Sequence, residues 1–389
     1  MSGLSGAAAI VGIGATDFSK DSGRSELRLA AEAVCAALDD AGLTPADVDG
    51  LVSFTMDTNT EVAVARSVGI PHLKFFSRIH YGGGAACATV QQAAMAVATG
   101  VADVVVAYRA FNERSGARYG QVNIDLAAQV NSSGTDNAFS YPHGLSTPAS
   151  FVAMVAQRYM HVSGATSADF GAVAVADRAH AATNPKAFFH GKPITLEDHQ
   201  NSRWIAEPLH LLDCCQESDG GVAIVVTSAA RAKDLKQTPA MIAAAAQGSG
   251  PDQYIMTSYY RDGLTGLPEM GIVGDQLWEQ AGIGPQDIAT AVLYDHFTPY
   301  VLMQLEELGF CGRGEAKDFV ADGIQVGGRL PINTHGGQLG EAYIHGMNGI
   351  AEGVRQIRGT AVNQVDDVDH VLVTAGTGVP TSGLVLSRS

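Results

Sequence analysis

Short apolar runs recur along the chain and alternate with longer segments rich in Ala and Leu. The short runs contain many Val and Ile residues and show no regular polar alternation, which is typical of strands covered on both faces. They predict strands at 8–13, 51–54, 103–108, 221–227, 241–245, 290–294, 370–374 and 383–386. The longer segments predict helices at 27–38, 85–98, 150–160 and 168–182. Strands that alternate with helices indicate α/β layers.

The sequence also contains an internal duplication. Residues 41–48 (AGLTPADV) return as residues 281–288 (AGIGPQDI), each time before an apolar run. A second match pairs residues 83–84 and 100 with residues 336–337 and 353, all of them Gly. Because each copy takes about half of the chain, we expect two similar domains and not a solenoid. The predicted N-terminal half is 1–110 plus 208–238, the C-terminal half is 239–389, and 111–207 is an inserted loop domain. We expect the site between the halves.

Composition and charge exclude several classes of protein. The 389 residues are 46% hydrophobic and 16% charged, which indicates a large globular core. A net charge of −16 opposes binding to nucleic acid or to an anionic membrane, and no run reaches the length of a membrane span. Five Cys without a C-x-x-C pair predict reduced thiols in a cytoplasm, with neither a disulfide framework nor a structural metal.

Several motifs carry a resemblance to a known family. They are residues 182–185 (ATNP), 208–215 (PLHLLDCC), 218–220 (SDG), 294–297 (YDHF) and 333–337 (NTHGG). With these motifs the chain resembles the thiolase superfamily, particularly its sterol-carrier-protein type, over essentially its whole length. The resemblance implies a duplicated α/β fold in five layers, α-β-α-β-α, with a loop domain and a homodimer.

At the positions where thiolases carry their catalytic residues, this chain has other residues. Counting back from Ala98-Thr99-Gly100, the nucleophilic Cys of the family falls at Gly83. Cys87 lies four residues later, which is one helical turn or about 5.4 Å further along. The family His after the double Gly becomes Tyr343, and the first residue of the Asn-Glu-Ala-Phe motif becomes Tyr294. The C-terminal Cys motif becomes residues 375–378 (AGTG).

This pattern of loss has a chemical interpretation. A retro-aldol cleavage needs a base for the hydroxyl and a site for the enolate, but no acyl-enzyme. The chain is similar in this respect to the thiolase-related aldolases of bacterial steroid side-chain degradation. That likeness implies cleavage of a 17-hydroxy steroid with a short acyl-CoA side chain to a 17-ketosteroid and propionyl-CoA. It also implies a small zinc-ribbon and OB-type partner, and no cofactor apart from the substrate's own CoA.

Two other classes remain open from the sequence. The first is an acyl-CoA thiolase that uses Cys87, and the second is a noncatalytic acyl-CoA or sterol binder on the same scaffold. Lys-dependent aldolase chemistry is disfavoured, because no Lys occurs between Lys236 and Lys317 or after Lys317. The scattered His residues show no metal-binding spacing.

The candidate catalytic residues are Tyr294, Tyr343, His296, His345 and Asp295. We expect one Tyr to act as base and the other as hydrogen-bond donor to the enolate, because a neutral Tyr donates well. The two His residues are the nearest groups that could tune them, and Asp295 could orient His296 or a Tyr. Each has a structural alternative: a core Tyr with a polar contact, a buried structural His, or a solvated Asp.

Gly-rich segments and two Arg residues are candidates for binding the substrate. Gly83 and Gly84 precede a helix and could offer backbone N–H groups to an oxyanion or a thioester, although close packing explains them equally well. Arg114 and Arg118 could contact CoA phosphates. Residues 12–14 (GIG) start like a dinucleotide fingerprint, but Asp17 replaces the third Gly, so we interpret them as turn glycines.

Overall fold

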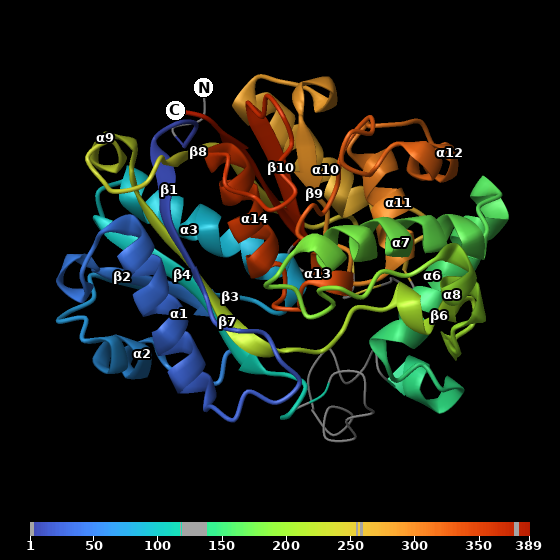
Figure 1. Cartoon of the computed structure of the whole chain (residues 1–389), viewed down its shortest axis with the longest axis horizontal. Helices are drawn as coiled ribbons and strands as arrows, with labels where there is room; N and C mark the ends of the chain where they lie inside the picture. The colour runs from blue at the N-terminus through green and yellow to red at the C-terminus, as the bar shows by residue number, and fades with distance from the viewer. Residues whose placement is uncertain (1–3, 117, 119–137, 254–255, 257–259, 377–380) are drawn as a thin grey trace.

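The structure, a computed structural model, describes residues 4–116, 118, 138–253, 256, 260–376 and 381–389 (Figure 1). Within these residues nine strands form one sheet in the order β3-β2-β4-β7-β1-β8-β11-β10-β9. The eight predicted strands are confirmed, and β3 is an addition. The strands are β1 (Ala8–Ala15), β2 (Gly50–Phe54), β3 (Phe75–Ile79), β4 (Val104–Asn112), β7 (Asp219–Ser228), β8 (Ala240–Gly248), β9 (Thr290–Val292), β10 (His370–Ala375) and β11 (Thr381–Ser387).

The two halves repeat one topology, as the duplication predicted. The order β2-β4-β7-β1 in the first half has its counterpart in β9-β10-β11-β8 in the second. Helix α1 (Glu26–Ala41) ends at Gly42 and is followed by a 3-10 turn at Pro45–Asp47, and α10 (Pro268–Ala281) ends at Gly282 before the turn Pro285–Asp287. The repeated segment of the sequence is therefore the same helix end in each half.

The second sequence match, which joined three glycines of each half, is wrong. Gly100 follows the end of α3 (Ala86–Ala98), whereas Gly353 lies in the middle of α14 (Met347–Arg358). The glycines at 336–337 belong to a separate short helix, α13 (Gly337–Gly340). Gly353 is needed for packing, since a Cβ there would lie 2.7 Å from Val373 Cγ2 in β10. The glycines were matched because their spacing along the sequence is equal, but they have different structural roles.

Helices α3 and α14 lie between the two halves of the sheet and contact each other and strands of both halves. The central apolar cluster accordingly joins Ala88 and Val90 of α3 to Ile350 and Val354 of α14. The outer faces are covered by α1 and α2 (Glu61–Val68) on the first half and by α10 and α11 (Thr298–Glu307) on the second (Figure 1). This arrangement confirms the five-layer α-β-α-β-α fold.

The glycines at 12 and 14 do not form a turn. Both lie inside β1, and a Cβ on either would overlap backbone atoms of α1. Their absent side chains let the helix pack closely on the strand.

The segment between β4 and β7 contains a helical region that packs on the C-terminal half. It includes α6 (Pro148–Ser163), α7 (Ser167–Thr183), α8 (Leu196–Asn201) and the small sheet of β5 (Trp204–Ala206) with β6 (Leu209–His210). Helix α7 contacts α11, α13 and α12 (Ala316–Asp322), and Figure 1 shows this region beside the C-terminal half. Of the helices in the described ranges, none combines the length and apolar character that a membrane span requires.

Candidate active site

Tyr294 and Tyr343 meet through their side chains. Their hydroxyl oxygens are 3.0 Å apart and share a hydrogen bond, in which either hydroxyl can donate. Tyr294 lies two residues beyond β9, which ends at Val292 and not at Tyr294 as the apolar run had indicated. Tyr343 lies in the connection between α13 and α14. The structure therefore joins the two residues that the sequence had proposed for the chemistry.

A buried polar network holds the backbone of Tyr294. Its N–H donates to Thr374 Oγ1 at 3.0 Å, and its carbonyl accepts from Gln304 Nε2 at 2.9 Å. Thr374 in turn donates to Gln304 Oε1 at 2.6 Å. Two elements thus fix the residue, because Thr374 lies in β10 and Gln304 in α11. Such support limits the movement of a side chain that must be accurately placed.

The backbone of Tyr343 is tied to the first half of the fold. Its N–H donates to Ser218 Oγ at 3.1 Å, and Ser218 directly precedes β7. Ser218 belongs to the SDG motif, whereas Tyr343 follows the NTHGG motif. The tyrosine pair therefore lies where the two halves of the duplication meet.

Gly83 faces the hydroxyl of Tyr294. A Cβ at position 83 would overlap that hydroxyl oxygen and also the ring carbon that bears it. The neighbouring Gly84 carbonyl accepts a hydrogen bond from Ser382 Oγ, which also accepts from the N–H of Ala88 at 3.1 Å. The N-terminus of α3 is thus partly satisfied by protein, and the role of Gly83 and Gly84 in oxyanion binding stays a prediction.

His345 lies beside Tyr343, with ring centroids 4.8 Å apart. Its Nδ1 accepts a hydrogen bond of 3.2 Å from Arg109 Nε, so the imidazole proton is on Nε2. Burial, reinforced by the positive charge of Arg109, lowers the pKa of His345 well below its ordinary value. His345 is therefore a neutral hydrogen-bonding group near neutral pH.

His296 lies next to Tyr294, with ring centroids 4.8 Å apart, and stacks on Tyr300 at 4.9 Å. Its backbone carbonyl accepts from the N–H of Cys215 at 2.9 Å. Burial lowers the pKa of His296 to about 3, so this ring is also neutral. Both histidines accompany the tyrosine pair, and burial disfavours the charged form of each.

Asp295 is buried, so the solvated alternative is wrong. Its carboxylate accepts the backbone N–H groups of Gln338 at 2.8 Å and Leu339 at 3.1 Å in α13. It also lies close enough to the carboxyl of Asp177 in α7 for the two to share a proton. These contacts are with α13 and α7, so the role of Asp295 in orienting His296 or a Tyr rests on the sequence alone.

Arg114 and Arg118 converge on one carboxylate, that of Glu217. The distances to Glu217 Oε2 are 3.7 Å from Arg114 Nη1 and 2.6 Å from Arg118 Nε. Both arginine side chains are about one third exposed, at 33% and 34%. Their predicted contact with CoA phosphates remains open.

Sequence reasoning missed a group of buried charges in and after β4. Arg109 is fully buried within this strand, binds His345 and pairs with Asp57. Glu113 follows the strand with only 2% of its surface exposed. Burial raises the pKa of Glu113 well above its ordinary value, partly opposed by Arg109. The sequence signal that could have indicated these residues was an Arg inside an apolar run, followed by a Glu at the end of the strand.

The electrostatic environment keeps both tyrosines neutral. Burial raises the pKa of Tyr294 and of Tyr343 well above the ordinary value. A buried neutral phenol is a good hydrogen-bond donor to a developing oxyanion. It is a poor base unless its own proton can pass to another group.

Cys87 is not placed to act as a nucleophile. It lies in the first turn of α3 with no exposed surface, and its Sγ contacts the carbonyl oxygen of Val373 at 3.6 Å. Burial raises the pKa of its thiol, which disfavours the reactive thiolate. Residues 377 and 378, which form part of the changed C-terminal Cys motif, lie outside the described residues. In the described part of the chain, no group of three His, Cys, Asp or Glu side chains is arranged to hold a metal ion.

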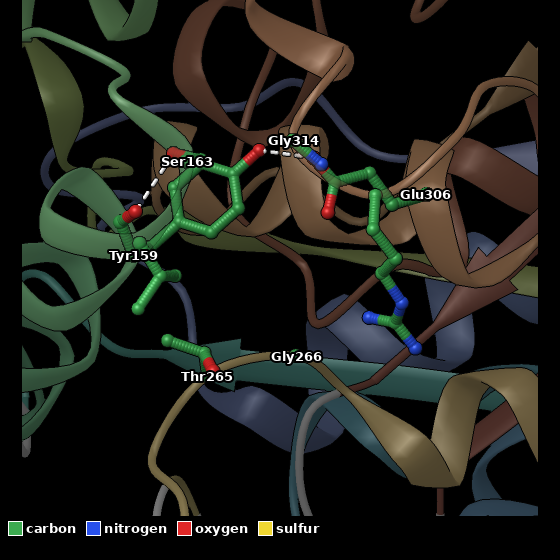
Figure 2. A pocket seen from close by; sticks show the side chains of 8 residues that line it. Tyr159, Ser163, Thr265, Gly266, Glu306 and Gly314 are labelled. Carbon is green, nitrogen blue, oxygen red and sulfur yellow. Dashed lines mark hydrogen bonds between the residues drawn. The ribbon is translucent and has the colours of Figure 1, made fainter.

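A separate pocket of about 220 Å³ lies between α6 of the loop region and the C-terminal half (Figure 2). Its lining includes Tyr159, Ser163, Glu306 and Arg313, and none of the candidate catalytic residues. Tyr159 donates to Glu306, which also accepts the N–H of Gly314 at 3.0 Å (Figure 2). Because these polar groups bind one another, the pocket offers no evident chemistry, and the tyrosine pair is the better candidate for the site.

The fold and this site place the chain in a known class. Residues 8–230 match the family described as "Thiolase, N-terminal domain", and residues 255–388 match "Thiolase C-terminal domain-like". The chain belongs to the thiolase family.

Particular relatives are much more similar. The chain is 79% identical over 384 residues, with 98% of this chain and 100% of the relative covered, to "17-hydroxy-3-oxo-4-pregnene-20-carboxyl-CoA lyase" of Mycobacterium tuberculosis. It is 71% identical to "Steroid side-chain-cleaving aldolase" of Thermomonospora curvata, with 99% of each chain covered. The solved structure "Ltp2-ChsH2(DUF35) aldolase" covers 100% of this chain and 99% of its own, with a TM-score of 0.95 at 70% identity.

Proposed function

We propose that this protein is a lyase that cleaves the side chain of a 17-hydroxy steroid acyl-CoA by a retro-aldol reaction. In a 20-carboxyl-CoA substrate, C20 carries a methyl group and the thioester. Breaking the C17–C20 bond therefore gives a 17-ketosteroid and propionyl-CoA. The two relatives with high identity, which cover essentially the whole chain, support this activity and substrate class.

The single observation that carries the chemistry is the hydrogen-bonded pair of Tyr294 and Tyr343 at the position where a nucleophile is missing. The C17 hydroxyl loses its proton as the C17–C20 electron pair moves onto the thioester, which becomes an enolate. One phenol receives the hydroxyl proton while its own proton passes through the hydrogen bond between the two hydroxyls toward the enolate. The other phenol donates a hydrogen bond to the enolate oxygen. C20 then takes up a proton, so the reaction is balanced without an oxidant or a reductant.

The direct test uses the whole protein with 17-hydroxy-3-oxo-4-pregnene-20-carboxyl-CoA. Mass spectrometry should detect the 17-ketosteroid and propionyl-CoA in equal amounts. The matched 17-deoxy substrate should bind but stay intact, because it has no hydroxyl proton to lose. Thiolytic cleavage of a 3-ketoacyl-CoA by added CoA, without cleavage of the hydroxy steroid, would contradict the proposal.

We infer that a second protein assembles with this chain. The support is the similar solved structure, whose name joins Ltp2 with ChsH2(DUF35). The zinc-ribbon and OB-type character of such a partner follows from the family resemblance alone. Co-expression and co-purification with a DUF35 protein, followed by comparison of kcat with and without it, would test the interaction.

We also infer a homodimer. Strand β3 is at the edge of the sheet, and Phe76 in this strand is 60% exposed. An edge strand with an exposed aromatic side chain suits pairing across a twofold axis. The family resemblance supports the same arrangement.

A further inference from the structure

His345 turns one edge of its ring toward the glycine loop that faces the tyrosine pair. A Cβ at Gly82 would lie 3.6 Å from both Cδ2 and Nε2 of His345, whereas a Cβ at the adjacent Gly83 would overlap the hydroxyl of Tyr294. The ring of His345 also lies beside that of Tyr343, with the centroids 4.8 Å apart. The Nε2 edge of His345 and the Tyr294 hydroxyl therefore face two consecutive residues of the same short loop.

Arg109 determines which nitrogen of His345 carries the proton. Its Nε donates to Nδ1 of His345 at 3.2 Å. Because a ring nitrogen that accepts a hydrogen bond is not protonated, the neutral imidazole has its hydrogen on Nε2. Burial and the positive charge of Arg109 keep the ring neutral, since both lower the pKa of His345. His345 therefore presents an N–H, and not a lone pair, toward Gly82.

The guanidinium of Arg109 is itself held by several groups. It pairs with the carboxylate of Asp57 and lies over the rings of Phe54 and Phe111, at 5.5 Å and 4.4 Å from their centroids. The Asp57 carboxylate also accepts the N–H of Phe54 at 3.1 Å, at the end of β2. An ion pair that is confined in this way can fix the tautomer of an imidazole, as the carboxylate of a catalytic triad does.

The backbone of His345 has an unusual conformation. Its φ angle is 50°, in the left-handed region that residues other than Gly adopt only at a cost, and the following Gly346 has a φ of 87°. Such a conformation persists where the surrounding contacts maintain it, and it is often found at functional sites. The fold therefore places this ring against its local preference.

We propose that the Nε2–H of His345 is a second hydrogen-bond donor to the enolate oxygen, and that the pair of Asp57 and Arg109 positions this donor by fixing the tautomer. This inference rests on the proposed function. As the C17–C20 electron pair moves onto the thioester, its oxygen gains negative charge, and the hydrogen bonds that it accepts become stronger. His345 gives up no proton in this step, because the proton of the substrate hydroxyl passes through the tyrosine pair.

The first test compares His345→Met, which removes the donor, with His345→Gln, whose amide N–H can take the place of Nε2–H. The kcat of steroid cleavage should fall about a hundredfold in His345→Met, as for one lost oxyanion donor, and by less than about tenfold in His345→Gln. KM should change little in either variant, because the hydrogen bond strengthens in the transition state. Native kcat in folded His345→Met would overturn the role of the donor.

Arg109→Met tests the positioning role. It should lower kcat at least about tenfold in the native background but cause no further loss in His345→Met, because Arg109 acts through that ring. Since Arg109→Met leaves the Asp57 carboxyl buried without its cation, the variant Asp57→Asn/Arg109→Met, which removes both charges, is measured beside it. Arg358→Met breaks another buried pair, that of Arg358 with Asp40 at 2.8 Å, and should keep native kcat as the control. A further loss in the His345→Met background would overturn the positioning role.

A spectroscopic readout does not need the steroid. In protein labelled with ¹⁵N-histidine, the signals of His345 are identified by their absence in His345→Gln. They should show one neutral tautomer with hydrogen on Nε2 in the native protein and a mixture of tautomers in Arg109→Met. Addition of propionyl-CoA should shift the Nε2 signal, because the thioester oxygen accepts this N–H. A mixture in the native protein, or an Nε2 signal that propionyl-CoA leaves unchanged, would overturn the inference while leaving the lyase intact. If the native protein fails to cleave the steroid, the proposed function falls, and these two measurements then decide on Arg109 and His345 by themselves.

Discussion

The hydroxyl of Tyr294 fills the space that a side chain at Gly83 would need. Position 83 corresponds by counting to the thiolase nucleophile, so the loss of that Cys and the gain of a Tyr are a single structural change. A nucleophilic side chain and the present Tyr294 cannot occupy the site together. The site therefore differs from a thiolase site by more than the missing nucleophile, because Tyr294 fills the space of that side chain.

We predict that Gly83→Cys abolishes cleavage and does not create a thiolase. The new Cβ must displace Tyr294, whose backbone is held by Thr374 and Gln304. Gly83→Ala should also lower kcat, by about a hundredfold, as expected when a catalytic acid or base is displaced. Gly263→Ala is the control, because a Cβ at Gly263 meets no atom within 4 Å. Native kcat in Gly83→Ala would contradict this view of the site.

We predict that Cys87→Ala keeps near-native activity. The thiol is fully buried and contacts only structural groups among those described, such as the carbonyl of Val373. Loss of the buried sulfur should lower the free energy of unfolding by about 1 kcal/mol, similar to removal of one buried methylene. Steady-state kinetics and urea denaturation would check both parts. A folded variant without activity would return Cys87 to the catalytic mechanism.

We predict that Tyr294→Phe and Tyr343→Phe each lower kcat by roughly a hundred- to ten-thousandfold. Each change removes one hydroxyl of the pair joined at 3.0 Å, while the aromatic packing remains. The double variant should lose less than the product of the two single losses, because the hydroxyls act as a unit. Binding of the 17-deoxy substrate should be retained. Near-native kcat in both single variants would direct attention to His296 and His345.

Much of the fold could be predicted, because strands that are buried on both faces leave continuous apolar runs and the repeated helix ends leave a repeated motif. The tyrosine pair was predictable for a different reason. Tyr294 and Tyr343 each lie at a fixed distance from a recognisable motif, so counting located them without any knowledge of their contact.

The remaining parts depended on contacts between distant segments. Spacing could not show that Gly353 packs against β10, nor that the carboxylate of Asp295 turns toward α13. Arg109 and Glu113 lie within and beside an apolar strand, where the sequence shows neither their burial nor their neighbours. The role of a charged residue such as Arg109 can be inferred only when its partner, here Asp57, is known.

We predict that Phe76→Arg weakens a homodimer. The residue is exposed on the edge strand β3, where a charge opposes pairing with a second chain. Light scattering at micromolar concentrations should show a dimer for the native protein and a shift toward monomer for the variant. Val62→Arg, which adds the same charge at a 63% exposed position in α2, should leave the mass unchanged. A monomeric native protein would count against the homodimer itself.

The last prediction concerns the buried carboxyls of Asp177 and Asp295. Burial raises the pKa of both carboxyls, and that of Asp177 is raised well above its ordinary value because the neighbouring Asp295 acts in the same direction. The two backbone N–H groups of α13 that Asp295 accepts oppose the effect of burial on Asp295. A carboxyl whose pKa is raised in the folded protein contributes stability that is complete below its unfolded pKa. That contribution is lost as the pH rises through its folded pKa.

Asp177→Asn should therefore remove this loss, because the amide can donate to Asp295 at every pH and never ionises. Relative to the variant, the native protein should lose stability as the pH rises from about 4, by about 1.4 kcal/mol for each pH unit in which only the unfolded state is ionised. Melting temperatures of the two proteins across pH 4 to about 9 would measure the difference. Asp275→Asn, which changes an exposed carboxyl in α10, is the control. If Asp177→Asn followed the native curve at a constant offset over this range, the two carboxyls would not share a proton. The hydrogen bond that Asp177 accepts from Asn333 Nδ2 at 3.4 Å would then be the contact that keeps this carboxyl in place.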